Sequence, residues 1–360
     1  MEEKIRFIFI LPALSDSHFK NRVLEFVNRG MEVEVYGFTR VGQKEVGNLP
    51  YKYKSIGELH DEGYKERVRL YLSIFKRLGK IYKGKNVVFY LCGLDIAMFF
   101  HYINPSFRYI YEECDLVHTY LGSLKAPLEW IDKRIIRKSL LTVTTSGGFI
   151  NYHFDGNCPE NVVLVENKLN PSILECNIKE KKTFSKERIE MGFVGAPRFD
   201  SVYNFIDVFC KNFPNGTFHV FGGPILKQFE PLKKYSNCVF HGFFKNPVDL
   251  PEIYAGIDVV VATYDTKFEN VRYAEPNKIY ESVFFETPIV VSSGTFLAEK
   301  VKRLGIGYDI DAMNDEEIIR FVKELTEESL YKKIVTARSI DKKEMLNIND
   351  FFFDKLEEVI

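Results

Sequence analysis

The chain of 360 residues is nearly neutral, with 49 Lys and Arg against 50 Asp and Glu and a formal net charge of −1. This balance argues against a nucleic-acid-binding protein, because phosphate contacts need a basic surface. The hydrophobic content of 46% is enough for the cores of two domains, and no apolar stretch reaches the roughly 18 residues of a membrane-spanning helix.

The first residues and the cysteines favour a cytoplasmic protein. The charged sequence Met1–Lys4 runs directly into a strand pattern and is not typical of a secretory signal peptide. The six cysteines are scattered and lack the paired spacing of a zinc site. We therefore expect reduced, mostly buried thiols.

The N-terminal half alternates between strand and helix patterns. The first strand is expected at Ile5–Leu11, and the helix after it at Phe19–Asn28. The same rhythm continues with a helix from Asp95 and with strands at Val33–Phe38, Asn86–Leu91, Arg108–Glu112 and Leu141–Thr144. Such alternation builds a parallel sheet with right-handed crossovers, so residues 1–170 are predicted to form a Rossmann-like domain. Its first loop lacks Gly-x-Gly-x-x-Gly, which argues against a dinucleotide there.

Polar side chains follow several of these strands, and ligands of parallel sheets bind at the carboxyl ends of the strands. The candidates on this side are Asp16, His18, Arg22, Asp95, Glu112, Glu113 and Asp115. Each has a structural alternative. Asp16 and Asp95 also suit helix or loop caps. Glu112 and Glu113 must face opposite sides if the strand continues through both.

The segment 65–85 is strongly basic. It carries Lys or Arg at positions 65, 67, 69, 76, 77, 80, 83 and 85, against the single acid Glu66. Apolar residues interleave at helical spacing, namely Leu70, Tyr71, Ile74, Phe75, Leu78 and Ile81. A basic amphipathic helix can lie on an anionic membrane surface. The alternative is a solvated helix whose apolar face packs on the sheet.

The chain changes character after residue 170. Residues 171–188 are charged and aperiodic, which is typical of an interdomain linker, and a second domain is predicted at 189–345. Its first strand ends at Gly195, where backbone can approach a ligand closely, and Arg198 follows three residues later. Residues 346–360 close the chain, and Asp350–Ile360 has the apolar pattern of a packed helix.

Two further segments complete the pattern of the second domain. A strand from Cys238 runs into a loop with Phe243 and Phe244, followed by a short helix and a buried strand within 255–264. A helix then opens at Pro276, which suits a first helical position, and a strand follows at Ile289–Val291. In that helix Lys278 and Glu281 lie three residues apart and share one face.

In this order, the segments over roughly 189–311 resemble the donor-binding domain of nucleotide-sugar glycosyltransferases with the GT-B fold. The resemblance is to the retaining, glycogen-synthase-like group that includes bacterial polysaccharide and capsule enzymes. It implies an α/β fold with two Rossmann-like doubly wound domains facing a central cleft, and a final helix that crosses back to the first domain. Two positions depart from the family pattern: Tyr273 stands where the first of two glutamates is usual, and Tyr203 where a lysine is usual.

The resemblance also implies roles for individual residues. Glu281 would bind the ribose, while Arg198 and Lys278 would meet the diphosphate and act in catalysis. The other donor-binding residues would be Gly195, Phe243, Phe244, Glu275 and Asn277. The acceptor side would be formed by Asp16, His18, Asp95, Glu113 and Asp115.

The expected function is transfer of a sugar from a nucleoside diphosphate sugar, with UDP favoured, to a polysaccharide or lipid-linked saccharide. Retention of configuration, independence from a metal and the absence of a cofactor follow from the resemblance. A cytoplasmic protein, peripheral on the inner face of the membrane through residues 65–85, is expected. Two alternatives stay open: a nucleotide-sugar 2-epimerase of the same fold, and a non-catalytic subunit that binds nucleotide sugar.

Overall fold

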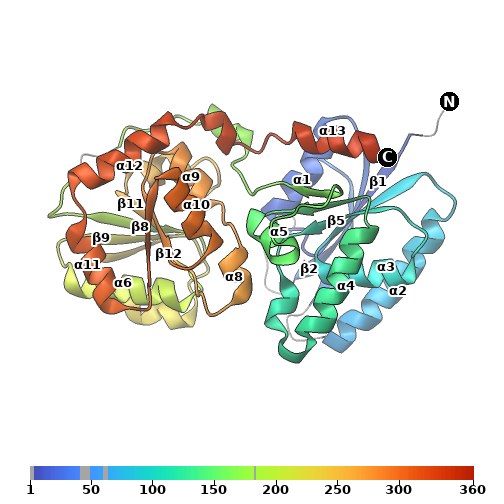
Figure 1. Cartoon of the computed structure of the whole chain (residues 1–360), viewed down its shortest axis with the longest axis horizontal. Helices are drawn as coiled ribbons and strands as arrows, with labels where there is room; N and C mark the ends of the chain where they lie inside the picture. Colours follow the sequence, from blue (N-terminus) through green and yellow to red (C-terminus); the bar gives the residue numbers. More distant parts are fainter. Residues whose placement is uncertain (1–3, 41–48, 60–63, 182–183) are drawn as a thin grey trace. The chain divides into compact units, whose positions relative to one another are not determined.

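The computed structural model describes residues 4–40, 49–59, 64–181 and 184–360, and the side chains of Tyr64 and Lys65 lie outside this description. Two compact units divide the chain (Figure 1). Unit 1 holds residues 1–166 and 349–360, and unit 2 holds residues 167–348. Residues 1–3 of the charged start and residues 182–183 of the expected linker fall outside the described ranges.

Unit 1 is built on a parallel sheet of seven strands in the order β3-β2-β1-β4-β5-β6-β7. The strands are β1 Arg6–Leu11, β2 Glu32–Arg40, β3 Tyr53–Leu59, β4 Val87–Cys92, β5 Tyr109–Glu113, β6 Leu141–Thr144 and β7 Val162–Leu164. The helices are α1 Ser17–Asn28, α2 Tyr64–Tyr82, α3 Leu94–Ile103, α4 Lys125–Lys138, α5 Gly147–Phe154 and α13 Asp350–Val359, with short turns η1 Val117–Tyr120 and η2 Gly122–Leu124.

Apolar side chains cover both faces of this sheet, because successive residues of a strand point to opposite faces. In β1, Ile8 and Ile10 belong to one core, which α2, α3 and α4 complete. Phe7 and Phe9 belong to the other core, which α1 and α13 complete. The sheet is therefore doubly wound, as the sequence predicted.

Helix α13 belongs to unit 1, although almost two hundred residues of unit 2 precede it. Phe352, Phe353 and Leu356 are buried in the same core as Phe26 of α1. The ring centroids of Phe26 and Phe353 lie 5.1 Å apart in an edge-to-face arrangement, within the roughly 4.5–7 Å usual for aromatic pairs. The end of the chain thus stabilises the domain formed by its beginning.

Unit 2 has a parallel sheet of six strands in the order β10-β9-β8-β11-β12-β13. The strands are β8 Glu190–Val194, β9 Thr217–Phe221, β10 Cys238–Gly242, β11 Val259–Ala262, β12 Ile289–Ser292 and β13 Gly307–Ile310. The helices are α6 Asp200–Asn212, α7 Leu250–Ala255, α8 Glu269–Tyr273, α9 Lys278–Phe284, α10 Phe296–Leu304, α11 Asp315–Glu324 and α12 Glu327–Ser339, with turns η3 Pro171–Glu175, η4 Lys227–Lys234 and η5 Lys342–Met345.

The first residues of the expected linker pack as part of unit 2. Turn η3 covers Pro171–Glu175, and its Ile173 is fully buried in a core of unit 2. Leu169 also pairs with Leu346 there. The boundary between the units therefore falls at residues 166 and 167, a few residues before the expected end of the first domain.

Each sheet has a point at which its strand order reverses. In unit 1 this point lies between β1 and β4, and in unit 2 between β8 and β11. The loops that leave the carboxyl ends of such strands diverge, and ligands of doubly wound sheets bind in the resulting crevice. The loop of Gly195 and Arg198 leaves β8, and the loop of Asp16 and His18 follows β1.

Candidate functional site

Three glycines lie at the carboxyl ends of neighbouring strands in unit 2. Gly195 follows β8, Gly222 follows β9, and Gly242 ends β10. The amide of Gly195 donates to the carbonyl of Phe221 at 2.7 Å, and the amide of Gly222 donates to the carbonyl of Gly242 at 2.7 Å. A Cβ atom on Gly222 would lie 2.3 Å from the carbonyl oxygen of Gly195, so no side chain fits there. This glycine edge, formed by Gly195, Gly222 and Gly242, presents bare backbone. The sequence analysis identified Gly195 as a donor-binding residue and missed Gly222.

Glu281 of α9 lies at the centre of a buried polar group of unit 2. Its side chain is 1% exposed and accepts a hydrogen bond from the Tyr254 hydroxyl at 2.5 Å. The Lys278 ammonium donates to both carboxylate oxygens at 2.9 Å. The expected pair on one helix face is therefore formed, and Lys278 keeps 13% of its side chain exposed. Tyr254 was missed, because it comes from α7 and no local pattern links it to α9.

Glu275 occupies a second buried position, just before α9. It is 4% exposed, forms an ion pair with Lys300 of α10 and accepts a hydrogen bond from the Tyr280 hydroxyl. Asn277 is exposed at the N-cap of α9, which spans Lys278–Phe284 and so begins two residues after Pro276. The ammonium of Lys300 is a cation of this region that the sequence analysis did not identify.

Arg198 is exposed in the loop after β8. Its guanidinium lies 5.1 Å from the centroid of the Phe199 ring. The loop is fastened by a hydrogen bond from the Gln228 amide to the carbonyl oxygen of Arg198 at 3.1 Å. The loop that carries Arg198 is thus fixed at the end of β8, where the strand order of the sheet reverses, and the Arg198 side chain is exposed to solvent.

Tyr264, directly after β11, connects Arg198 with Glu281. Burial is the main cause that raises the pKa of Tyr264, the charge of Glu281 raises it further, and the charge of Arg198 lowers it. Both charges therefore act on this one ring. Tyr264 follows β11, which lies on the other side of the β8–β11 switch point from the loop of Arg198.

The two phenylalanines expected near a base lie in different environments. Phe243 is 64% exposed, and its ring would be 3.3 Å from a Cβ atom on Gly223. Phe244 is half-buried and packs on a core that includes Tyr254 and Val194. Phe243 is therefore a largely exposed ring close to Gly223, while Phe244 mainly supports the fold.

The sequence contains one Asp-x-Asp pattern, Asp309-Ile310-Asp311, at the end of β13. Asp309 forms an ion pair with Lys302 at 2.9 Å. Asp311 accepts a hydrogen bond from the amide of Met313 at 3.0 Å. Both carboxylates are engaged in contacts within their own neighbourhood of unit 2.

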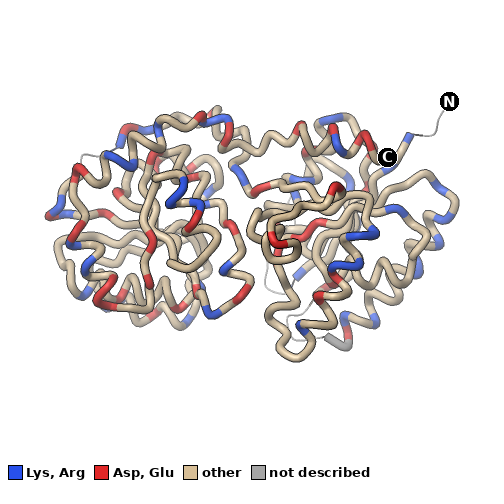
Figure 2. Tube along the Cα trace, in the orientation of Figure 1, with Lys and Arg blue, Asp and Glu red and all other residues tan. Residues whose placement is uncertain are grey.

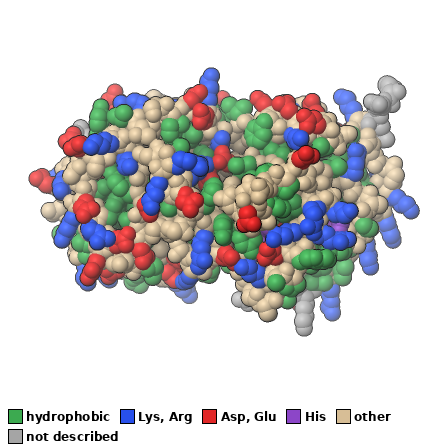
Figure 3. Space-filling model, viewed as in Figure 1, with side chains coloured by type: hydrophobic (Ala, Val, Ile, Leu, Met, Phe, Trp, Pro, Cys, Tyr) green, Lys and Arg blue, Asp and Glu red, His purple; other side chains and the backbone are tan. Residues whose placement is uncertain are grey.

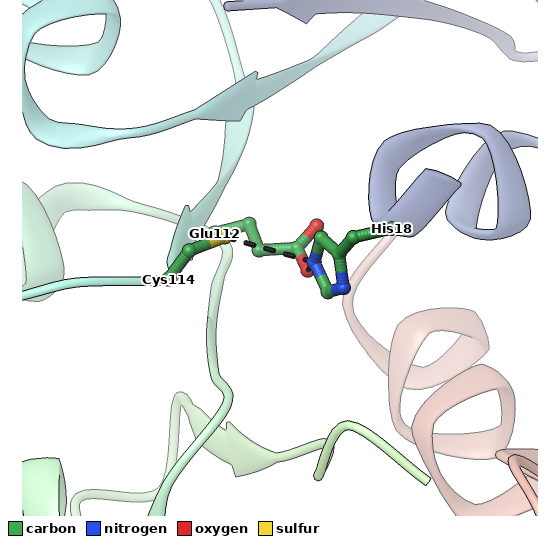
Figure 4. Close-up of side chains that lie close together, drawn as sticks. All are labelled: His18, Glu112 and Cys114. Atoms are coloured by element: carbon green, nitrogen blue, oxygen red, sulfur yellow. Dashed lines mark hydrogen bonds and ion pairs between the residues drawn. The ribbon is translucent and has the colours of Figure 1, made fainter. Parts of the chain in front are cut away.

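In unit 1, His18 and Glu112 form the centre of the expected acceptor side (Figure 4). The ring nitrogen Nε2 of His18 and a carboxylate oxygen of Glu112 are 2.8 Å apart, and the sulfur of Cys114 lies 3.6 Å from the same nitrogen. Arg22 of α1, itself buried, contacts Glu112 at 3.3 Å. Sequence reasoning had named Arg22 and Glu112 among the polar residues at this edge, and the structure brings them together.

The charge state of Glu112 follows from these neighbours. Burial alone would raise the pKa of its carboxyl, but Arg22 and His18 outweigh that effect and hold the pKa well below its usual range. An ionised carboxylate only accepts hydrogen bonds, so Nε2 of His18 is the donor. Glu112 thus orients the ring of His18, of which 28% is exposed.

The other acceptor-side candidates lie elsewhere in unit 1. Asp16 is the N-cap of α1 and accepts from the amide of His18 at 2.8 Å. Asp95 lies in the first turn of α3 and accepts from the Tyr71 hydroxyl at 2.7 Å. Asp115 is exposed beyond β5. Glu113 points to the face opposite Glu112 and is buried against His153 at 2.7 Å.

Helix α2 carries the basic segment (Figures 2 and 3). Its apolar face is buried in a core of unit 1 through Tyr71, Ile74, Phe75, Leu78 and Tyr82. Exposed basic residues line the outer face and the turn after it, namely Arg69, Lys76, Arg77, Lys80, Lys83 and Lys85. Most of the apolar stripe is therefore taken up by the sheet, but Ile81 of the expected stripe is exposed, and Val68 and Leu72 are exposed among the basic residues of the solvent-facing side. Among the described residues, no helix has the length and apolar character needed to span a bilayer.

Comparisons with known proteins agree with this architecture. No protein-family model matches the chain. The succinoglycan biosynthesis protein ExoL of Rhizobium meliloti (strain 1021) is 22% identical over 350 residues, which cover 89% of this chain and 85% of that protein.

Solved structures match over nearly the whole chain. Sucrose-phosphate synthase from Thermosynechococcus elongatus aligns with a TM-score of 0.71 at 11% identity, covering 99% of this chain and 100% of that one. Anabaena HepE, solved in complex with UDP and glucose, aligns with a TM-score of 0.71 at 12% identity, covering 98% of this chain and 99% of that one. The two doubly wound units and these alignments confirm the expected architecture: the chain has the GT-B fold.

Proposed function

We propose that the chain is a glycosyltransferase that moves a sugar from a nucleoside diphosphate sugar, with UDP favoured, to a polysaccharide or lipid-linked saccharide. The observation that carries this proposal is the group around Glu281, a buried carboxylate that pairs with Lys278 in the same unit as the glycine edge. The resemblance to ExoL, a protein of polysaccharide biosynthesis, and to HepE, which was solved with UDP and glucose, supports this assignment.

The donor would be held entirely by unit 2. Its base would stack on the exposed ring of Phe243, and Glu281 would accept a hydrogen bond from the ribose. The diphosphate would lie over the bare backbone at Gly195, between Arg198 and Lys278. When the bond from the sugar to the diphosphate breaks, negative charge grows on the leaving oxygen, and these fixed cations would stabilise it. This role needs no metal, and we propose that transfer is metal-independent and retaining.

The acceptor would be bound by unit 1. His18 is the group best suited to meet a saccharide hydroxyl there, because Glu112 fixes its ring through Nε2 and leaves Nδ1 to face a ligand. The exposed carboxylate of Asp115 would add a second acceptor for hydroxyl groups.

Donor binding tests the proposal directly. We expect UDP-sugars to raise the unfolding temperature of the intact chain more than GDP-, CMP- or dTDP-sugars, because a ligand that binds only the folded state stabilises it. Weak hydrolysis of the bound donor would separate an active enzyme from a non-catalytic subunit. A complete lack of stabilisation by every nucleotide sugar would reject the proposal.

We also propose that the protein associates with the inner face of the cytoplasmic membrane through the outer face of α2. Because most of the apolar stripe of this helix is buried, attraction between charges would carry most of the contact, at about 1 kcal/mol for each Lys or Arg near an anionic surface. Such binding is reversible and weakens with salt.

Sedimentation with lipid vesicles tests this contact. Wild-type protein should sediment with anionic vesicles at low salt and stay in solution with neutral ones. Changing Lys76, Arg77, Lys80 and Lys83 together to Gln should abolish the effect. A control that removes the same charge from unit 2, with Gln at Arg320, Lys323, Lys332 and Lys333, should sediment like wild type. Equal sedimentation of both variants would refute the role of α2.

A further inference from the structure

A second group of charged side chains is buried in unit 1, on the face of the sheet opposite Glu112. It consists of Glu113 at the end of β5, His118 in η1, Asp132 in α4 and His153 in α5. The side chains are between 0% and 2% exposed. Four elements that are separate in the sequence therefore each contribute one metal-binding side chain to the same buried spot.

The distances among Glu113, Asp132 and His153 fit the coordination sphere of one ion, and His118 lies next to Asp132. Nε2 of His153 lies 2.7 Å from Oε1 of Glu113 and 4.0 Å from Oδ2 of Asp132. Nδ1 of His118 lies 3.4 Å from the same oxygen of Asp132. Glu113, Asp132 and His153 each offer one ligand atom within 4.8 Å of the others. Tetrahedral ligands about 2.1 Å from a zinc ion are roughly 3.4 Å apart, and the observed separations bracket this value.

Hydrogen bonds within the protein do not account for the polar atoms of this cluster. Both carboxylate oxygens of Asp132 and Nδ1 of His118 are buried and have no hydrogen-bond partner among the described residues. A buried carboxylate without a hydrogen bond is costly unless a nearby positive charge compensates it. Asp132 is fully buried and aimed at the two histidines, so the cluster provides acceptors that need a positive partner.

The surroundings of His118 match those of a metal ligand. Its second nitrogen, Nε2, lies 3.3 Å from the hydroxyl of Tyr152, and that hydroxyl donates to Glu129 at 3.3 Å. Histidine ligands of metals commonly use one nitrogen for the ion and the other for an oriented hydrogen bond. This contact leaves Nδ1 of His118 as the nitrogen that faces Asp132.

We propose that Glu113, Asp132 and His153 bind one divalent transition-metal ion, best matched by Zn²⁺, and that the neighbouring His118 completes its ligands through Nδ1. Two imidazoles and two carboxylates are ligands that zinc accepts, and the two carboxylates would balance its charge. With four protein ligands and no exposed position, the site is structural: it ties η1, α4 and α5 to the end of β5. It is separate from the sugar transfer proposed above and stands whether or not that proposal holds.

Metal analysis of the intact wild-type chain tests the proposal. Protein purified from zinc-supplemented cells and passed over a chelating resin should retain about one zinc per chain. Protein produced with cobalt instead should show the visible absorption of four-coordinate Co²⁺. Absence of both a bound transition metal and the cobalt absorption would overturn the proposal and identify the cluster as a network of ion pairs.

Variants locate the ion. Asp132→Asn and His118→Gln should each lower the retained zinc at least about tenfold, while His101→Gln, which changes a buried histidine elsewhere in unit 1, should keep it. Retention of the full metal content by both cluster variants would contradict the assignment. If a cluster variant fails to fold, the metal content and cobalt absorption of the wild-type chain still decide the question.

Discussion

Replacing Glu281 with Gln should weaken the binding of UDP without unfolding unit 2. The carboxylate has about four sites for accepting hydrogen bonds. Tyr254 uses one and Lys278 uses two, which leaves one for a ribose hydroxyl. The structure therefore supports a single charge-assisted contact with the ribose. Such a contact contributes roughly 1.5–3 kcal/mol, so Kd should rise about ten- to a hundredfold.

Titration calorimetry with UDP measures this change. Gln keeps the size of the side chain, and thermal unfolding of the variant reports whether the contact with Tyr254 still supports the fold. Glu286→Gln is a matched control, because it removes an ion-paired carboxylate just beyond the end of the same helix. A folded Glu281→Gln variant that binds UDP as tightly as wild type would remove Glu281 from the donor site.

Three further changes test other parts of the account. Arg198→Ala should lower turnover roughly 10²–10³-fold while leaving the unfolding temperature unchanged. Arg320→Ala, on the surface of α11, should leave turnover unchanged. A strict requirement of the reaction for added Mg²⁺ or Mn²⁺ would contradict the metal-free step. Phe353→Ala should destabilise unit 1 by about 3–5 kcal/mol in urea unfolding, because Phe353 is 2% exposed, whereas Phe351→Ala at 51% exposure should change little. Burial raises the pKa of Glu34, but hydrogen bonds from Lys54, Tyr82 and Tyr36 outweigh this effect and lower the pKa to about 2. The ionised carboxylate therefore stabilises the folded protein fully above pH 4.5, and this contribution is lost as the pH falls toward 2. Between pH 4.5 and 2 the unfolding free energy of Glu34→Gln should therefore fall by on the order of 1 kcal/mol less than that of wild type. If the unfolding free energies of both proteins depend on pH in the same way, Glu34 contributes nothing.

Much of the fold could be predicted because its strands are continuous apolar runs. The strand expected at Ile5–Leu11 is observed at Arg6–Leu11, and Leu141–Thr144 is observed as expected. Strands buried on both faces consist of such runs, and the helices between them show one apolar face. The confirmed fold class follows from this alternation. The beginning of unit 2 at residue 167 could not be seen, because the burial of Ile173 depends on residues far along the chain.

The candidate site was predictable only where neighbours in the sequence are also neighbours in space. Lys278 and Glu281 pair because a helix brings residues three apart onto one face. Tyr254, Gly222 and Lys300 reach the same region from other elements, and their positions depend on the order of strands in the sheet. The sequence predicted that Glu112 and Glu113 point to opposite faces of the sheet. It did not predict their ionic partners, because Arg22, which pairs with Glu112, comes from α1, and His153, which pairs with Glu113, comes from α5.

Product analysis tests the central claim most directly. The purified chain is incubated with a UDP-sugar, with and without a saccharide acceptor, and the products are separated and examined by mass spectrometry and NMR. The account predicts that free UDP appears together with a glycosylated acceptor whose new bond keeps the configuration of the donor. A nucleotide sugar whose sugar has been epimerised while still attached to UDP would identify the chain as a 2-epimerase and contradict the proposed transfer.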